Sequence, residues 1–187
     1  MVNRHRFSTE FEATCHRPEL KSLSYSIALL GATVMSEKVE IERGFYHHAR
    51  SYLNAAESDD EAPDFNSLNM LQALILITYY EFRRTSFARA WLSLGRANRL
   101  ANMLGLHAMD QDKQSKTQAD FILPLPEPVG LAEMEERRRS FWVLFTFDVY
   151  ASIRTGSKTS IDGEVFLRDP RIQFIVYWKL TIIISIN

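Results

Sequence analysis

The feature that most constrains the fold of this chain is the recurrence of apolar residues at spacings of three and four over most of its length. That spacing places apolar side chains on one face of an α-helix. Glycine (7) and proline (6), which interrupt helices, are few among the 187 residues. We therefore predict an all-α fold: a bundle of antiparallel helical hairpins with about five main helices, incomplete at the C-terminus.

The first two predicted helices form one hairpin. One runs from Pro18 to about Met35, because proline is tolerated in a first helical turn. The next begins after a Ser36 cap and continues to the polar run 57–66. The stripe expected to be buried on the first helix consists of Leu20, Leu23, Ile27, Leu30 and Val34.

Three further helices follow. The segment from Ser67 to Arg84 is apolar on nearly every side, which predicts a central helix surrounded by neighbours. Ser86 can cap the next helix, and the longest helix runs from Leu131 to about Thr155. The stripe on the Ser86-capped helix comprises Phe87, Ala90, Trp91, Leu94, Ala97, Ala101 and Leu104.

Charge and cysteine content exclude several classes of protein. Lysine plus arginine (22) nearly balances aspartate plus glutamate (23), so no chain-wide positive field attracts nucleic acid. Cys15 is the single cysteine, which excludes an internal disulfide and a zinc cage built from cysteines of this chain. Residues 172–186 are strongly apolar, but this run is shorter than the ~20 residues of a membrane span. The N-terminus carries no secretory signal, so we expect a nuclear or cytosolic address and no membrane association.

Two glycines and a histidine stand in or after the Ser86-capped helix. Gly105 follows the last periodic residue and is predicted to be a left-handed helix cap. Gly95 is predicted to allow close approach of another helix or ring. His107 is expected to hydrogen-bond a terminal carbonyl, with a catalytic or metal-binding role as the alternative.

The arginines do not form a convincing DNA-binding patch. Three arginines, Arg89, Arg96 and Arg99, lie near one face of the Ser86-capped helix. They are expected to be solvated or to pair with buried carboxylates, and phosphate contact is the alternative. In "EMEERRRSFW", Glu133 with Arg137 and Glu135 with Arg139 stand at i, i+4, which predicts local neutralisation.

The remaining titratable candidates are Asp148 and a histidine pair. Asp148 lies beside the stripe containing Phe141 and Phe145, so it requires a partner, and we predict a buried ion pair with Arg96 or Arg99. A ligand-binding or catalytic carboxylate is the alternative. His47 and His48 are adjacent and cannot chelate a metal ion as an i, i+4 pair does. No nucleophile elbow, phosphate loop, dinucleotide fingerprint or paired-cysteine motif is present, so nothing favours an enzyme.

Several linked motifs together resemble one family. "MLQALILITYYEFRRTSFARAWLSLGRANRLANMLGLH" and "EMEERRRSFWVLFTFDVYASIRTGSKTSID" are similar to the fungal-specific transcription factor domain, the middle homology region of zinc binuclear cluster regulators. The matching positions are Trp91, Gly95, Arg99, Gly105, His107, Glu136, Arg138, Phe141, Trp142, Asp148 and Gly156. The resemblance implies an all-helical regulatory domain of a nuclear transcription factor, with no catalytic, cofactor-binding or metal-binding residue among these positions.

The resemblance covers about residues 18–162, so we predict an N-terminal extension at 1–17 and a divergent apolar tail at 163–187. The tail is hypothesised to be non-native sequence that covers an exposed core face or promotes aggregation. Family members carry zinc in a six-cysteine cluster that Cys15 cannot supply, so DNA contact is expected to be indirect and no cofactor is expected in this chain. The proline usual after the turn glycine is replaced by Ser157.

The resulting hypothesis is a domain that controls transcription through protein or ligand contacts. The implied partners are proteins of the transcription machinery, a second copy of the chain in a homodimer, and a small-molecule effector. One alternative is a helical protein-interaction scaffold unrelated to transcription, although no ~34-residue repeat is visible. An enzyme would require convergent polar groups in a pocket beside Asp148 and His107.

Overall fold

The computed structural model describes residues 1–35, 39–58, 67–109 and 125–161. Within these ranges every regular element is a helix, so the all-α prediction is confirmed. The elements are α1 (Arg4–Thr14), α2 (Pro18–Met35), α3 (Val39–Ser58), α4 (Leu68–Arg84), α5 (Phe87–Met103), the 3₁₀-helix η1 (Leu106–Ala108) and α6 (Leu131–Thr155).

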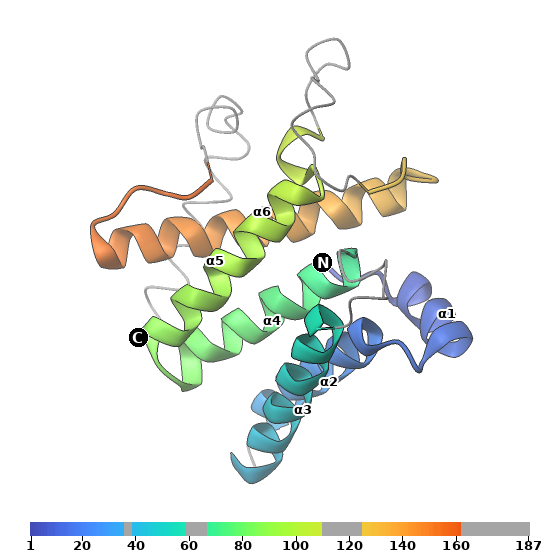
Figure 1. Cartoon of the computed structure of the whole chain (residues 1–187), viewed down its shortest axis with the longest axis horizontal. Coiled ribbons are helices and arrows are strands. Elements are labelled where there is room, and N and C mark those ends of the chain that lie inside the picture. Colours follow the sequence, from blue (N-terminus) through green and yellow to red (C-terminus); the bar gives the residue numbers. More distant parts are fainter. Residues whose placement is uncertain (36–38, 59–66, 110–124, 162–187) are drawn as a thin grey trace.

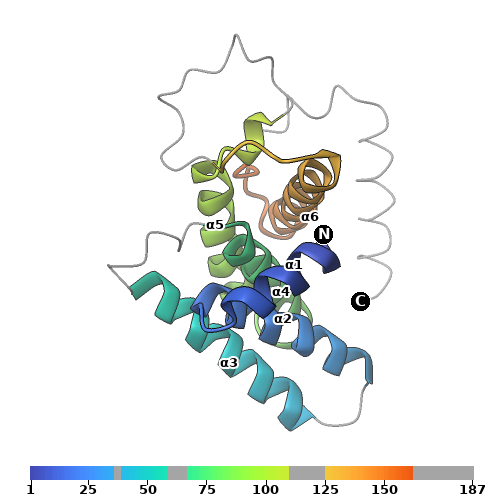
Figure 2. The ribbon, with the colours of Figure 1, turned by 90° about the vertical axis from the view of Figure 1, so that its right-hand side faces the viewer.

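The helix α4 lies at the centre of the molecule. It packs against α2, α3, α5 and α6, with α2 and α3 on one side and α5 and α6 on the other (Figures 1 and 2). Twelve of its 17 residues are buried, which confirms the central helix that the apolar run predicts. A helix that is apolar on most sides is stable only when neighbours surround it, and α4 has them.

The helix boundaries follow the local capping signals. The Ser67 hydroxyl accepts a hydrogen bond from Met70 N–H at the start of α4, and Ser86 accepts one from Arg89 N–H at the start of α5. Gly105 and Gly156 adopt φ values of 73° and 69° after α5 and α6, a left-handed conformation that favours glycine. The Ser36 cap lies outside the described residues.

The helix α1 was not predicted, since its apolar periodicity is limited to the i, i+4 pair of Phe7 and Phe11. None of its residues is fully buried, although Phe7 packs against the core. A capping signal was nevertheless available, because the Asn3 side chain accepts hydrogen bonds from His5 N–H and Arg6 N–H. The described ranges thus contain six α-helices, one more than the five main helices expected.

The predicted stripe on α2 is partly wrong. Ile27 is 38% exposed and Val34 is 83% exposed. The face that meets α3 instead includes Ser22 and Tyr25. The buried Ser22 hydroxyl donates to the Ala49 carbonyl at 2.9 Å, and the Tyr25 ring stacks on the Tyr52 ring. The contacts with α3 thus lie beside the predicted stripe, and part of that stripe is left at the surface.

Candidate functional site

A buried polar cluster joins α1 to the interface between α4 and α6. Arg6 of α1 binds both carboxylate oxygens of Glu136 at 2.8 Å through Nε and Nη2. Gln72 donates to Glu136 at 2.9 Å and to the Ser140 hydroxyl at 3.1 Å. We call this set the polar cluster; its members are Arg6, Glu10, Asn69, Gln72, Glu136 and Ser140.

The polar cluster holds Glu136 in its charged form. Burial alone would raise the pKa of this carboxyl group, but hydrogen bonds from Arg6, Gln72 and the Asn3 N–H outweigh burial, and the pKa is lowered. Burial likewise opposes the charge on Arg6, and its bonds to Glu136 and Glu10 outweigh that cost and raise its pKa. The cluster is therefore a satisfied ion pair that attaches α1 to the core.

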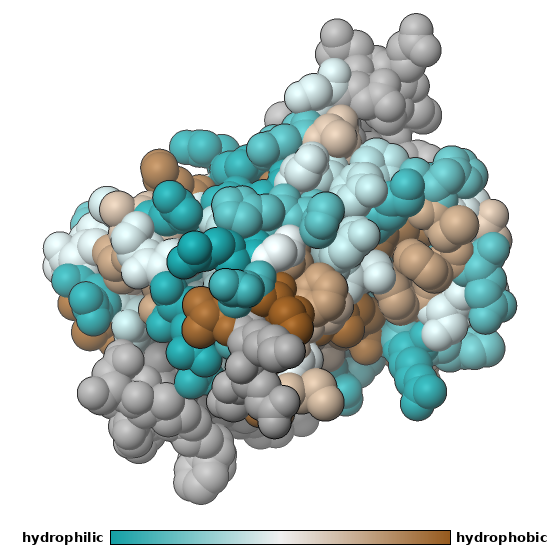
Figure 3. Space-filling model, turned by 90° about the horizontal axis from the view of Figure 1, so that it is seen from below, coloured by the Kyte–Doolittle hydropathy of each residue, from teal (hydrophilic) through white to brown (hydrophobic). Residues whose placement is uncertain are grey.

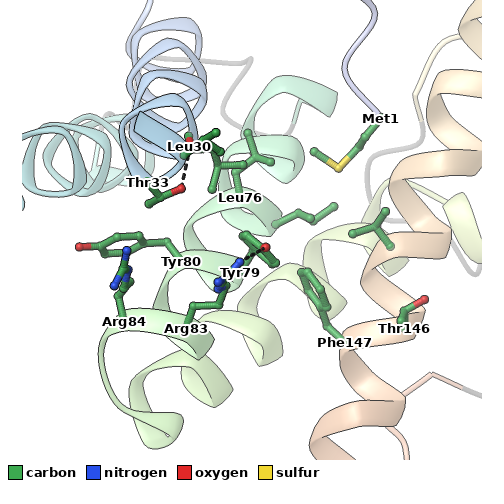
Figure 4. Close-up of a pocket in the computed structure, with 13 residues that line it drawn as sticks. Met1, Leu30, Thr33, Leu76, Tyr79, Tyr80, Arg83, Arg84, Thr146 and Phe147 are labelled. Atoms are coloured by element: carbon green, nitrogen blue, oxygen red, sulfur yellow. Dashed lines mark hydrogen bonds between the residues drawn. The ribbon is translucent and has the colours of Figure 1, made fainter. Parts of the chain in front are cut away.

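Further along the same interface, the polar residues give way to an apolar groove. The groove has a volume of about 680 Å³ and lies between α2, α4 and α6 (Figure 4). Its α4 side is formed by Leu76, Tyr79 and Arg83, and Val143 and Phe147 of α6 face them. The other lining residues are Met1, Leu30, Thr33, Val34, Ile75, Tyr80, Arg84 and Thr146.

The sequence did not single out this groove. Its residues belong to three helices, and their side chains read as ordinary core positions in the sequence. The available signal was that the segment from Ser67 to Arg84 is apolar on nearly every side.

Asp148 is buried, but the predicted ion pair is wrong. Its carboxylate accepts from Asn98 Nδ2 at 2.9 Å and from the backbone N–H groups of Ser160 and Ile161 at 2.7 and 2.9 Å. Arg96 pairs with Glu57 of α3 instead, and Arg99 is exposed. Asp148 therefore connects α5 to the segment that follows α6 by accepting hydrogen bonds from neutral donors. Sequence spacing could not reveal this structural arrangement.

The other motif residues of α5 and η1 fall into different environments. Trp91 is 48% exposed, so its predicted place in the buried stripe is wrong. A Cβ at Gly95 would meet no atom within 4 Å, so the predicted close approach is also wrong. His107 of η1 is half-buried. Arg89 and Arg99 are both exposed.

The predicted neutralisation of the arginine run is confirmed. Arg137 pairs with Glu133, and Arg139 pairs with Glu135 at 2.7 Å. Arg138 also binds Glu135, at 3.1 Å. Phe141 is buried and Trp142 is partly buried among the α6 aromatic residues. The run therefore offers little free positive charge for nucleic acid.

Exposed apolar side chains gather on parts of the surface between hydrophilic ones, as one face of the molecule shows (Figure 3). On α5, Trp91 and Leu92 are 48% and 73% exposed. Phe87 links Trp91 to α6, since its ring lies 6.3 Å from the Trp91 ring and the Arg154 guanidinium lies 5.2 Å from its centroid. We call Phe87, Trp91, Leu92 and Arg154 the Trp91 surface.

Within the described ranges there is neither a metal-binding cluster nor a membrane-spanning helix. No group of three or more His, Cys, Asp or Glu side chains there could hold a metal ion. No helix in the same ranges is long and apolar enough to cross a bilayer.

The fold and the site define a helical domain whose buried polar residues serve helix packing, with an exposed aromatic surface and an apolar groove. Residues 1–170 match the model of the fungal specific transcription factor domain. The chain belongs to this family. The predicted boundary between residues 17 and 18 stays a prediction, and the matched region includes α1.

Curated relatives are regulators of biosynthetic gene clusters. The chain is 37% identical over 156 residues to the depudecin biosynthesis cluster-specific transcription activator of Fusarium langsethiae, covering 83% of this chain and 25% of that protein. It is 36% identical to the activator of the same name from Alternaria brassicicola (83% and 24%) and 31% identical to a pigment biosynthesis transcriptional activator of Monascus ruber (80% and 26%). The chain thus spans about a quarter of the length of these relatives. No solved structure matches the chain.

Proposed function

We propose that this chain is a regulatory domain that controls transcription of a biosynthetic gene cluster in the nucleus. The observation that carries the proposal is the family match over residues 1–170 together with relatives named as cluster-specific transcription activators. The same findings favour this function over an unrelated helical scaffold, and they offer no support for an enzyme.

The domain acts through contacts with proteins of the transcription machinery or with a second copy of itself. The Trp91 surface supports this proposal, because its half-exposed tryptophan and its arginine, which both contact the Phe87 ring, are residue types enriched among the anchors of protein interfaces. We propose no cofactor for this chain and no direct contact with DNA by its residues. A small-molecule effector provides a second route of control.

The proposal is tested by fusing the chain to a heterologous DNA-binding domain in a filamentous fungus and measuring reporter transcripts. We expect the fusion to change transcription relative to the DNA-binding domain alone. Trp91→Ala is expected to reduce that change, whereas Val129→Ala, which alters an apolar side chain that is 96% exposed elsewhere, should leave it intact. A fusion without effect on transcription would refute the function. Light scattering on the purified variants shows whether Trp91 acts through a dimer.

A further inference from the structure

The groove between α2, α4 and α6 is apolar along its walls and positively charged at one end. Leu30, Ile75, Leu76, Val143 and Phe147 form the walls. The charged end carries the lining arginines, Arg83 and Arg84, and none of the described residues that line the groove is acidic. Figure 4 shows both arginines at the same end of α4.

The wall hydroxyls offer little to a polar ligand. Thr146 donates to the Trp142 carbonyl at 2.9 Å, and Thr33 donates to the Leu30 carbonyl at 2.7 Å. Both protons are thus used within their own helices. The walls favour an apolar body, and the polar recognition is confined to the arginine end.

Arg83 differs from the other arginine of the groove in its partners. Arg84 lies 3.6 Å from the buried carboxylate of Glu42. Arg83 donates to the Tyr79 hydroxyl at 2.9 Å and lies 5.7 Å from the centroid of that ring, and no carboxylate of the described residues pairs with it. Its charge is therefore available to an anion, and the Tyr79 O–H can donate to the same anion.

The neighbouring half of the interface shows what such an arginine binds in this molecule. In the polar cluster, Arg6 holds the carboxylate of Glu136 with two nitrogens. A carboxylate at Arg83 would repeat this chemistry, since guanidinium groups bind carboxylates in a planar, two-point geometry. The volume of about 680 Å³ also lies within the usual ~300 to 1,000 Å³ of small-molecule sites.

We propose that this groove binds a small amphiphilic carboxylate, with its apolar body between α2, α4 and α6 and its carboxylate on Arg83 and Tyr79. The role of such a ligand as the effector rests on the proposed regulatory function; its binding does not. Competing occupants are the apolar residues 163–187 of the same chain and a second copy of the chain, and the experiment below distinguishes them.

The test is isothermal titration calorimetry on the full chain with decanoate, and with 1-decanol as a probe that has the same apolar body but no charge. We expect saturable 1:1 binding of decanoate. Arg83→Gln should weaken decanoate binding about three- to tenfold and leave 1-decanol binding unchanged, because an exposed ion pair contributes modestly. Arg89→Gln, an exposed arginine on α5, is the matched control and should change neither affinity. Val143→Phe, which fills the groove, should weaken both probes.

Circular dichroism confirms that each variant is folded before titration. Absence of saturable decanoate binding, or equal affinities of the Arg83→Gln and parent chains, would overturn the proposal. Binding that appears only after removal of residues 163–187 would assign the groove to the chain itself and also overturn it. A dimer of the parent chain in sedimentation experiments that the Val143→Phe substitution dissociates would assign the groove to a second copy and would also overturn the proposal. Each result is independent of the reporter assay, so failure of the ligand site and failure of the transcriptional function can be told apart.

Discussion

The two halves of the α4–α6 interface differ in what fills them. Positions 69, 72, 76, 79 and 83 of α4 follow the three-and-four spacing of one helix face, as do positions 136, 140, 143 and 147 of α6. In the first half these positions are polar, and Arg6 of α1 fills the space between the helices. In the second half they are apolar or aromatic except for Arg83 at the end of α4, and the space remains as a groove.

This difference separates a structural half of the interface from the half for which we propose ligand binding. Buried polar groups are costly unless their donors and acceptors are paired, and no buried side-chain atom of the polar cluster lacks a hydrogen-bond partner. Apolar walls carry no such requirement and can remain open to a ligand. We therefore expect substitutions in the polar cluster to change stability and substitutions in the groove to change binding.

The largest effect is expected from Glu136→Ala. The substitution removes the buried carboxylate that binds Arg6 at two points, leaves Arg6 its pair with the more exposed Glu10, and should lower the free energy of unfolding by about 3 kcal/mol. Urea denaturation measures the change. Glu135→Ala is the matched control: it removes the neighbouring carboxylate, whose side chain is 43% exposed and pairs with surface arginines, and should cost at most ~0.5 kcal/mol. Equal effects of the two variants would contradict the structural role of the polar cluster.

Gln72→Leu should have the next largest effect. It replaces a fully buried amide with an apolar side chain of similar size and so makes the first half of the interface resemble the second. Arg6, Glu136 and Ser140 each lose one hydrogen bond, which we expect to cost about 2 kcal/mol. Thermal unfolding followed by circular dichroism tests this value. An unchanged or raised melting temperature would show that the cluster is not needed for stability.

A smaller effect is expected from acid. The pKa of Glu136 is lowered in the folded state because hydrogen bonds from Arg6 and Gln72 outweigh burial. Its contribution to stability is therefore present above the ordinary carboxyl value of 4.5 and is lost as pH falls through the folded-state pKa. Urea midpoints measured from pH 7 downward should fall in acid for the parent chain and fall less for Glu136→Gln. Identical profiles would rule out this linkage.

The smallest effect on stability is expected in the groove. Arg83→Gln removes an exposed guanidinium that hydrogen-bonds to the Tyr79 hydroxyl and lies against the Tyr79 ring. The free energy of unfolding should change by less than about 0.5 kcal/mol. Urea denaturation provides the measurement, and a loss comparable with that of Glu136→Ala would mean that the two halves of the interface do not differ as described.

Much of the fold was predictable because helices depend on local signals. Proline at the start of α2, the serine caps of α4 and α5, and the glycines that end α5 and α6 are read from neighbouring residues. The i, i+4 pairs of α6 are local in the same sense, and they form as predicted.

The errors concern contacts between residues far apart in the chain. Trp91 has the spacing of a core residue, yet α6 and α4 cover the adjacent face of α5, and the tryptophan is left half-exposed. Asp148 clearly needed partners, but Asn98 and the backbone of residues 160–161 supply them, because the arginines of α5 point elsewhere.

The sequence by itself determined the helices, their order, the need to satisfy Asp148 and the resemblance to a family, because periodicity, capping and motif spacing are properties of adjacent residues. Only the tertiary structure decided that Arg6 reaches Glu136 across 130 residues and that apolar side chains of three helices enclose a groove beside Arg83. The physical reason is that helical spacing specifies which side chains share a face, whereas the packing of helices specifies what each face meets.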